Sequence, residues 1–163
     1  MNTVFERTIL VSDMDGTLLD SRGSISRENI KALQHFVNLG GHFTLATGRS
    51  EATIARFMDE LPVNLPVILY NGAVLYDFNR QKVLWTQCLP TGLGGYLDQL
   101  ASDFPGIGME IFRDGQVFCI HENSFTQDHA CKERFSPQWG TVDSIQEPWF
   151  KVLCAWEHSR LVD

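Results

Sequence analysis

The chain has 163 residues, of which 44% are hydrophobic, and its formal net charge is -7 at pH 7. This length fits one ordinary domain, or one domain with a smaller second one. An acidic chain without a run of Lys or Arg argues against a nucleic-acid partner, and no apolar stretch approaches the roughly eighteen residues that a membrane span needs.

The N-terminal residues and the cysteines point to a reducing compartment. Residues 1–6 lack the basic and long apolar regions of a signal peptide, which predicts a cytoplasmic protein. The four cysteines are widely spaced without a C-x-x-C pair, so we expect free thiols. His129 and Cys131 could hold a metal only with two further ligands, and the sequence does not cluster any beside them.

The first half of the sequence alternates short apolar strands with amphipathic helices. The expected strands cover residues 8–12, 43–46 and 67–70. The expected helices begin after Ser26 and Ser50, whose side chains suit the N-cap position, and carry apolar residues at helical spacing. Continuous apolar strands that alternate with helices predict an α/β fold with a Rossmann-like parallel sheet.

The pattern changes after residue 76. The expected strands cover residues 73–76, 82–89, 109–112, 116–120 and 150–156, and the expected helices cover residues 91–102 and 124–135. The pair Asp114-Gly115 between two apolar runs is a strong hairpin signal. This part has α+β character, so we place a domain boundary there, with one domain at residues 1–76 and a second at 77–163.

The stretch Asp13-Met14-Asp15-Gly16-Thr17 follows the first strand directly. Residues two apart on a strand point to the same side, so the carboxylates of Asp13 and Asp15 can converge. Gly16 permits a backbone excursion that a side chain would oppose. Active sites of parallel sheets lie beyond the carboxyl ends of the strands, where this pair falls. The simpler alternative is an Asp-Gly turn that closes a buried strand.

Three motifs resemble those of one enzyme family. Residues 13–20 resemble the first signature of the haloacid dehalogenase superfamily of phosphohydrolases, in particular its Cof-type branch of sugar-phosphate and related phosphatases. Residues 46–49 (Ala-Thr-Gly-Arg) resemble the second signature, and residues 71–73 (Asn-Gly-Ala) resemble the point where the cap domain begins. The resemblance implies an incomplete Rossmann-like core at residues 1–76 and a partial inserted α+β cap at residues 77–163.

The same resemblance implies a reaction and a cofactor. Asp13 would be the nucleophile that forms an aspartyl-phosphate with a small phosphorylated metabolite. Asp15 would protonate the leaving group and then activate the water that hydrolyses the intermediate. The Asp13 side chain and the Asp15 carbonyl would bind Mg²⁺, which prefers oxygen ligands and removes the repulsion between the carboxylates.

Four further residues are implied in binding the substrate phosphate. Thr47 would hydrogen-bond a phosphoryl oxygen, and the Gly48 N–H would assist it. Two interpretations of Arg49 stay open, because it either approaches the substrate or is a surface charge. Asn71 either lines the cleft at the cap junction or belongs to an ordinary Asn-Gly turn.

The sequence also departs from the family. A lysine and a Gly-Asp-x-x-Asn-Asp type string should follow the cap, and nothing after residue 76 matches them; Lys151 lies in a strand-like context and receives no role. We therefore expect a truncated form of a longer protein, with an incomplete Mg²⁺ site and weak or no activity. Residues 8–12 would form an exposed hydrophobic edge, and self-association is one way to cover it.

Two other classes of protein stay open. The first is a non-catalytic fragment that binds a phosphorylated ligand or a partner without turnover. The second is a receiver-like phosphoacceptor domain, which would carry its acceptor aspartate after the third strand, where this chain has Asn71-Gly72.

Overall fold

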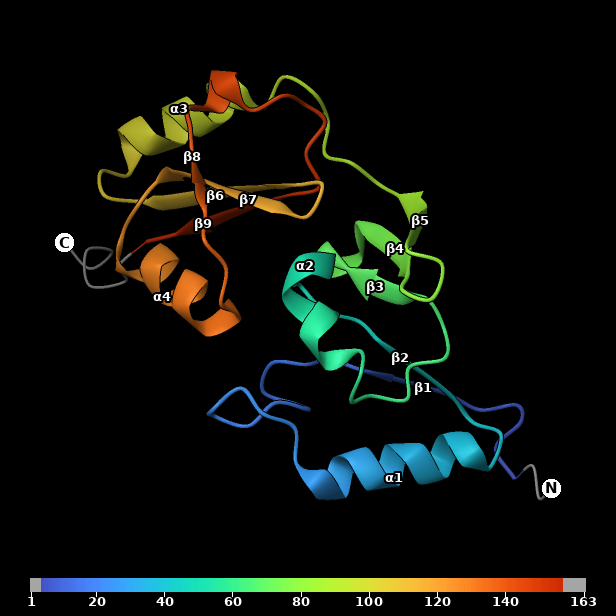
Figure 1. Cartoon of the computed structure of the whole chain (residues 1–163). Coiled ribbons are helices and arrows are strands. Elements are labelled where there is room, and N and C mark those ends of the chain that lie inside the picture. Colours follow the sequence, from blue (N-terminus) through green and yellow to red (C-terminus); the bar gives the residue numbers. More distant parts are fainter. Residues whose placement is uncertain (1–3, 157–163) are drawn as a thin grey trace. The chain divides into compact units, whose positions relative to one another are not determined.

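The computed structural model describes residues 4–156 and divides the chain into two compact units, residues 1–87 and residues 88–163 (Figure 1). The division falls after Gln87 and not after residue 76, where the sequence places it, because strands β4 and β5 pair with β3 and so belong to the first unit. The assignment of the two units as catalytic core and cap stays a prediction.

The described residues of the first unit, 4–87, form two α-helices and five strands. They are β1 (Ile9–Ser12), α1 (Arg27–Asn38), β2 (His42–Leu45), α2 (Glu51–Ile54), β3 (Val67–Leu69), β4 (Val74–Asp77) and β5 (Lys82–Thr86). Strand β1 runs parallel to β2, and β3, β4 and β5 form an antiparallel sheet. A parallel bridge between Ala46 and Ile68 joins β2 to β3, so the predicted α/β arrangement of the first three strands is confirmed.

Both predicted N-caps are present. The side chain of Ser26 accepts a hydrogen bond from the Asn29 N–H, and that of Ser50 accepts one from the Thr53 N–H. Helix α2 is shorter than its apolar pattern predicts, because the chain tightens into a 3₁₀ turn at Ala55–Phe57. The apolar side chains still reach the core, since Ile54 is 0% exposed.

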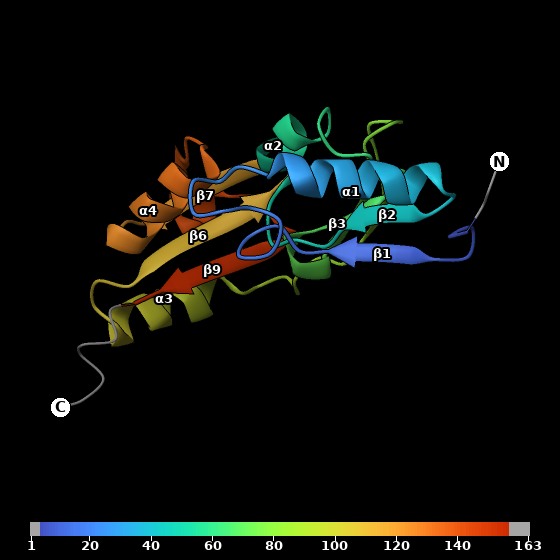
Figure 2. The same cartoon turned by 90° about the horizontal axis from the view of Figure 1, so that it is seen from below.

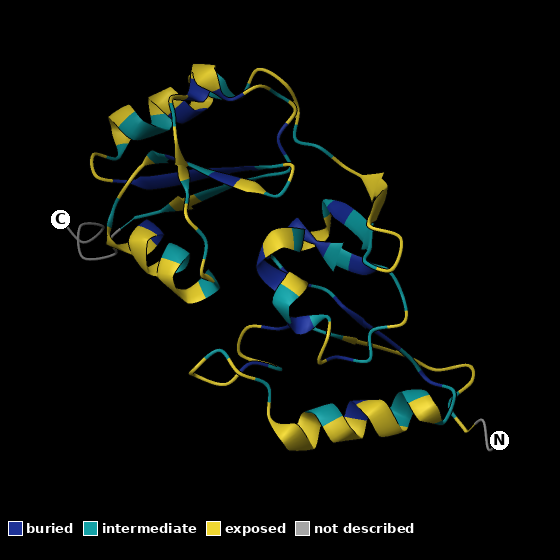
Figure 3. Cartoon of the chain, in the orientation of Figure 1, coloured by how far each residue is buried: buried dark blue, intermediate teal, exposed yellow. Residues whose placement is uncertain are grey.

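The core of the first unit lies around β2 and β3, which Figure 3 colours mostly as buried. Its fully buried members are Met14, Phe43, Leu45, Ile54, Val67 and Leu69. Strand β1 differs: Ile9, Leu10 and Val11 are 61%, 40% and 49% exposed. Among the described residues β1 pairs only with β2, and Figure 2 shows it at the margin of its unit. The expected exposed hydrophobic edge is therefore present.

Residues 88–156 of the second unit form a four-stranded sheet with an α-helix on each face. Its elements are α3 (Gly94–Asp103), β6 (Gly108–Arg113), β7 (Gln116–His121), α4 (Ser124–Glu133), β8 (Gln138–Trp139) and β9 (Lys151–Ala155). The strand order is β8-β7-β6-β9, and the β6–β7 hairpin confirms the turn predicted at Asp114-Gly115. This is the α+β character that the sequence indicates.

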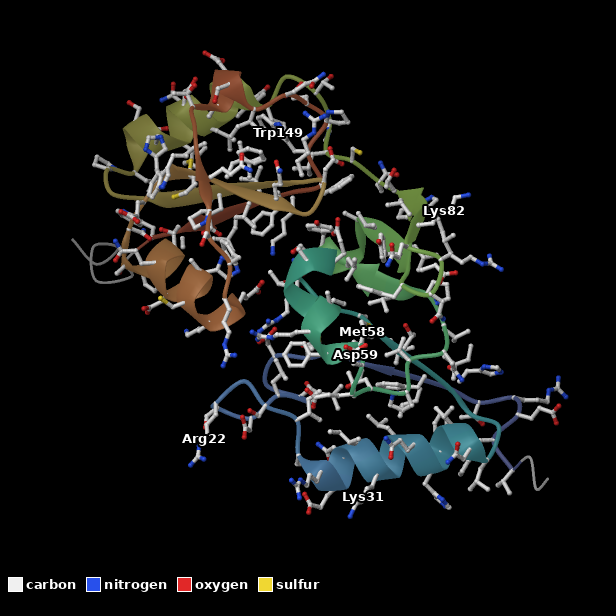
Figure 4. All side chains as sticks on the ribbon, in the orientation of Figure 1. Arg22, Lys31, Met58, Asp59, Lys82 and Trp149 are labelled. Carbon is white, nitrogen blue, oxygen red and sulfur yellow. The ribbon has the colours of Figure 1, made fainter. Side chains whose placement is uncertain are left out.

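The two faces of this sheet differ in chemistry because side chains alternate along β6. Met109 and Ile111 pack with Leu97 of α3 and with Trp149, which Figure 4 labels, in a buried apolar cluster. Glu110 lies on the opposite face and contacts His129 of α4.

Between residues 4 and 156, no helix is both long and apolar enough to cross a membrane.

Candidate active site

The predicted acidic pair lies where β1 ends. Met14 is fully buried, whereas its neighbours Asp13 and Asp15 are exposed. The Met14 N–H donates to Oδ1 of Asp13 across 2.7 Å. The buried methionine anchors the loop, so both carboxylates are held at the surface in the alternation that the strand pattern predicts.

A tight turn follows the pair. The carbonyl oxygen of Met14 accepts hydrogen bonds from the N–H groups of Leu18 and Leu19 at 3.0 and 2.8 Å. Gly16 has a φ of 73°, a left-handed conformation that favours glycine. Asp15 therefore lies between the end of β1 and the turn that the Met14 carbonyl closes with Leu18 and Leu19.

Several of the predicted site residues line one pocket of about 350 Å³. Its lining residues come from the chain segments that follow β1, β2 and β3, together with Ile68 of β3 itself, and they are Asp13, Ala46, Thr47, Gly48, Ile68, Asn71 and Gly72. Four separate sequence predictions, Asp13, Thr47, Gly48 and Asn71, therefore share one cavity at the carboxyl ends of the strands.

Thr47 and Asn71 are held by hydrogen bonds between the loops. Thr47 is 4% exposed, and its hydroxyl oxygen accepts the Arg49 N–H at 3.2 Å, which leaves the hydroxyl proton to donate into the pocket. The Asn71 N–H donates to the Thr47 carbonyl at 3.1 Å, and the Thr47 N–H donates to Ile68 at 2.9 Å. These backbone hydrogen bonds join the loop after β2 to β3 and to the loop after it.

Arg49 pairs with Asp15. Its Nε donates to Oδ2 and its Nη2 to Oδ1, both at 2.7 Å, so the guanidinium grips both carboxylate oxygens. Arg49 is 2% exposed, which rules out the surface-charge interpretation. Neither residue belongs to the described lining of the pocket. A role of Arg49 toward the substrate stays a prediction.

Sequence reasoning missed a second contact beside the pocket. The Tyr70 hydroxyl donates to Oε2 of Glu51 at 2.6 Å, and the Tyr70 side chain is 2% exposed. Local patterns gave no signal for it, because Tyr70 reads as a strand residue and Glu51 as an ordinary acidic residue in a first helical turn. The pair becomes visible only when the turn after β3 and the start of α2 are placed in space.

The donors for a metal ion are incomplete among the described residues. The Asp13 carboxylate and the Asp15 carbonyl are oxygen ligands of the type that Mg²⁺ binds. Between residues 4 and 156, no group of three or more His, Cys, Asp or Glu side chains is arranged to hold a metal. His129 instead hydrogen-bonds Glu110 at 2.6 Å and lies 3.2 Å from Glu133.

A carboxylate, a hydroxyl and an amide thus gather beyond three strand ends of an α/β unit, which is where α/β proteins bind their ligands. The chain belongs to the haloacid dehalogenase-like hydrolase family, whose model matches residues 10–157. The family predicted from the three motifs is therefore confirmed.

Named relatives are phosphatases. The chain is 25% identical over 161 residues to pyridoxal phosphate phosphatase YbhA of Escherichia coli, a match that covers 95% of this chain and 58% of that protein. It is 37% identical over 65 residues to 5-amino-6-(5-phospho-D-ribitylamino)uracil phosphatase YwtE of Bacillus subtilis. This match covers 40% of this chain and 22% of that protein.

A solved structure shares the fold. It is a haloacid dehalogenase-like hydrolase from Bacteroides thetaiotaomicron, with a TM-score of 0.72 and 23% identity over 87% of this chain and 55% of that one. The chain thus spans little more than half of the length of pyridoxal phosphate phosphatase YbhA and of this structural neighbour.

Proposed function

We propose that this chain carries the nucleophile and part of the phosphate site of a Mg²⁺-dependent phosphatase acting through an aspartyl-phosphate. The observation that carries the proposal is that Asp13 lines one pocket with Thr47, Gly48 and Asn71. A carboxylate beside hydroxyl and amide donors suits attack on a phosphate ester whose oxygens those donors hold.

The proposed reaction has two displacements. An Asp13 carboxylate oxygen attacks phosphorus, the ester P–O bond breaks, and the leaving alkoxide takes a proton from Asp15. Asp15 then takes a proton from water, whose oxygen attacks phosphorus and releases inorganic phosphate and the Asp13 carboxylate. The hydrogen bond from the Met14 N–H to Oδ1 orients the nucleophile and leaves Oδ2 for the attack.

The grip of Arg49 on Asp15 has a consequence for this mechanism. Both carboxylate oxygens of Asp15 accept guanidinium N–H groups. A proton on Asp15 would neutralise the carboxylate and weaken both of these bonds, so Arg49 favours the ionised form of Asp15 that activates water. The Asp15 side chain is 57% exposed, so water can reach it.

Mg²⁺ is the proposed cofactor. Asp13 would bind it through the side chain and Asp15 through the backbone carbonyl. When bound, the ion would offset the negative charges of the carboxylates and the phosphate. The two donors alone do not fill the coordination that Mg²⁺ prefers, so water and phosphate oxygens would supply the rest.

The proposed substrates are small phosphorylated metabolites. The names of the two relatives specify different phosphate esters, so they support a class of substrate and no single compound. The described residues of the pocket offer a hydroxyl and amide groups for the phosphate but carry no distinctive group for the rest of a substrate.

Turnover of p-nitrophenyl phosphate tests this function. With Mg²⁺ present, Asp13→Ala and Asp13→Asn are expected to lower the rate at least about a hundredfold. Asp59, labelled in Figure 4, is an exposed aspartate outside the described pocket lining, so Asp59→Asn is the matched control. A measurable rate that is equal in the wild type and Asp13→Asn would contradict the proposal.

The second candidate is a non-catalytic module that binds a phosphorylated ligand or partner. The observation in its favour is that residues 4–156 contain no cluster of three metal-binding side chains. Titration with Mg²⁺ and inorganic phosphate separates the candidates, since the module would bind phosphate without turning over an ester.

A further inference from the structure

Three consecutive residues after β3 have positive φ angles, 51° at Tyr70, 57° at Asn71 and 101° at Gly72. Glycine adopts this conformation freely and asparagine tolerates it, whereas a bulky residue such as tyrosine rarely does. A left-handed tyrosine costs conformational free energy, so the surrounding contacts must hold it in place.

The Tyr70 side chain supplies one of these contacts. Its hydroxyl donates to Oε2 of Glu51 across 2.6 Å, and the residue is 2% exposed. Glu51 is the first residue of α2, which Ser50 caps by accepting the Thr53 N–H. A hydroxyl–carboxylate bond this short is charge-assisted and strong, so the helix end fixes the tyrosine ring.

The backbone of the same residues is tied to the loop after β2. The Tyr70 N–H donates to the Arg49 carbonyl, and the Asn71 N–H donates to the Thr47 carbonyl, each at 3.1 Å. Asn71 and Thr47 line the pocket that contains Asp13. Because Tyr70 directly precedes Asn71, its conformation determines the position of Asn71 in the lining of this pocket.

We propose that Tyr70 and Glu51 are positioning residues that hold Asn71 in the left-handed conformation from which its side-chain amide donates to a bound phosphoryl oxygen. The inference rests on the proposed function, because it takes the ligand of the pocket to be a phosphate group. Tyr70 and Glu51 are not among the described lining residues, so they act through Asn71.

Phosphate binding to the full chain tests the proposal. Inorganic phosphate is titrated in the presence of Mg²⁺ and followed by ³¹P NMR, which reaches weak affinities. Tyr70→Phe keeps the buried ring and removes the hydroxyl, so phosphate affinity is expected to fall about tenfold. Tyr96 of α3 is 75% exposed, and Tyr96→Phe is the matched control with unchanged affinity.

A double-mutant cycle separates positioning from a general loss of stability. Asn71→Gly tolerates the positive φ but removes the amide, so adding Tyr70→Phe to it is expected to change phosphate affinity less than about twofold. Glu51→Gln retains an acceptor oxygen and is expected to lose less affinity than Tyr70→Phe.

The outcomes that contradict the two proposals differ. Normal affinity in Tyr70→Phe, or an equal loss with and without the Asn71 amide, would overturn the positioning role while the wild type still binds phosphate. A wild-type chain that binds no phosphate contradicts the proposed function, and the positioning role falls with it.

Discussion

Arg49 holds both carboxylate oxygens of Asp15 at 2.7 Å, although Arg49 is 2% exposed and the Asp15 side chain is 57% exposed. The guanidinium is thus buried with its charge matched by a carboxylate that water can reach. Such a planar two-bond contact depends on the fork of arginine, which the single ammonium of lysine does not reproduce.

Arg49→Lys tests the importance of this geometry. The substitution keeps the charge but loses one of the two hydrogen bonds, so the free energy of unfolding of the first unit is expected to fall by about 1–2 kcal/mol. Native-state hydrogen exchange of the β2 amides measures that free energy in the first unit alone.

Arg80→Lys is the control for the arginine substitution. Arg80 is 77% exposed and its Nε lies 3.7 Å from Oδ2 of Asp77, a surface pair of the kind that contributes about 0.5 kcal/mol or less. Equal losses in Arg49→Lys and Arg80→Lys would show that the buried fork contributes nothing beyond charge.

A pH dependence is expected in the second unit. Burial alone lowers the pKa of His129, but hydrogen bonds and charges from Glu110 and Glu133 outweigh it and raise the pKa from 6.5 to about 9. Because the folded pKa exceeds the unfolded one, the stabilisation is complete below pH 6.5 and is lost as the pH rises through 9.

The expected loss is up to about 3 kcal/mol between pH 6 and pH 10. Urea unfolding followed by tryptophan fluorescence measures it, because the buried Trp149 lies in this unit. His129→Gln is expected to flatten the pH profile, whereas His35→Gln, at an exposed position in α1, is expected to leave it unchanged. A wild-type profile as flat as that of His129→Gln would contradict the assignment.

Local chemistry made much of the first unit predictable from sequence. Ser26 and Ser50 cap helices because their hydroxyls meet amide groups of the first turn, an interaction confined to a few residues. Asp13, Thr47 and Asn71 meet in one pocket because parallel strands end at the same edge of a sheet. The strand pattern indicated Asp13, and the resemblance to family motifs indicated Thr47 and Asn71.

Long-range pairing explains what the sequence could not predict. The contacts of Arg49 with Asp15 and of Tyr70 with Glu51 join residues from separate chain segments, and no spacing rule links them. The division after Gln87 depends on the pairing of β4 with β3, which an apolar pattern does not specify. Helix α2 gives way to a 3₁₀ turn at Ala55–Phe57, which apolar periodicity does not distinguish from a longer α-helix.

The free edge of β1 predicts self-association. Ile9, Leu10 and Val11 are exposed on a strand that pairs on one side only among the described residues. Such an edge offers unpaired backbone groups beside apolar side chains, so a second copy of the chain is expected to pair with it. Light scattering at rising protein concentration is expected to show a molar mass above that of the monomer.

Val11→Lys is expected to return the chain toward the monomer, because a charge on an edge strand opposes pairing. Val4→Lys is the control, since Val4 is 61% exposed but lies outside the strands. If both substitutions dissociate the chain equally, the effect comes from net charge, and the β1 edge is not the interface.

The turn after the acidic pair gives a last prediction, in which two Gly→Ala substitutions have opposite signs. Gly16 has a φ of 73°, and a Cβ there meets nothing within 4 Å, so Gly16→Ala adds backbone strain without a clash. It is expected to destabilise the first unit by about 1–2 kcal/mol. Gly95 lies within α3, also in open space but without a positive φ, so Gly95→Ala is expected to stabilise the second unit by up to about 1 kcal/mol. Native-state hydrogen exchange, followed separately for amides of each unit, measures both changes in the free energy of unfolding. A Gly16→Ala variant with unchanged stability would mean that the left-handed turn does not hold Asp15 in solution.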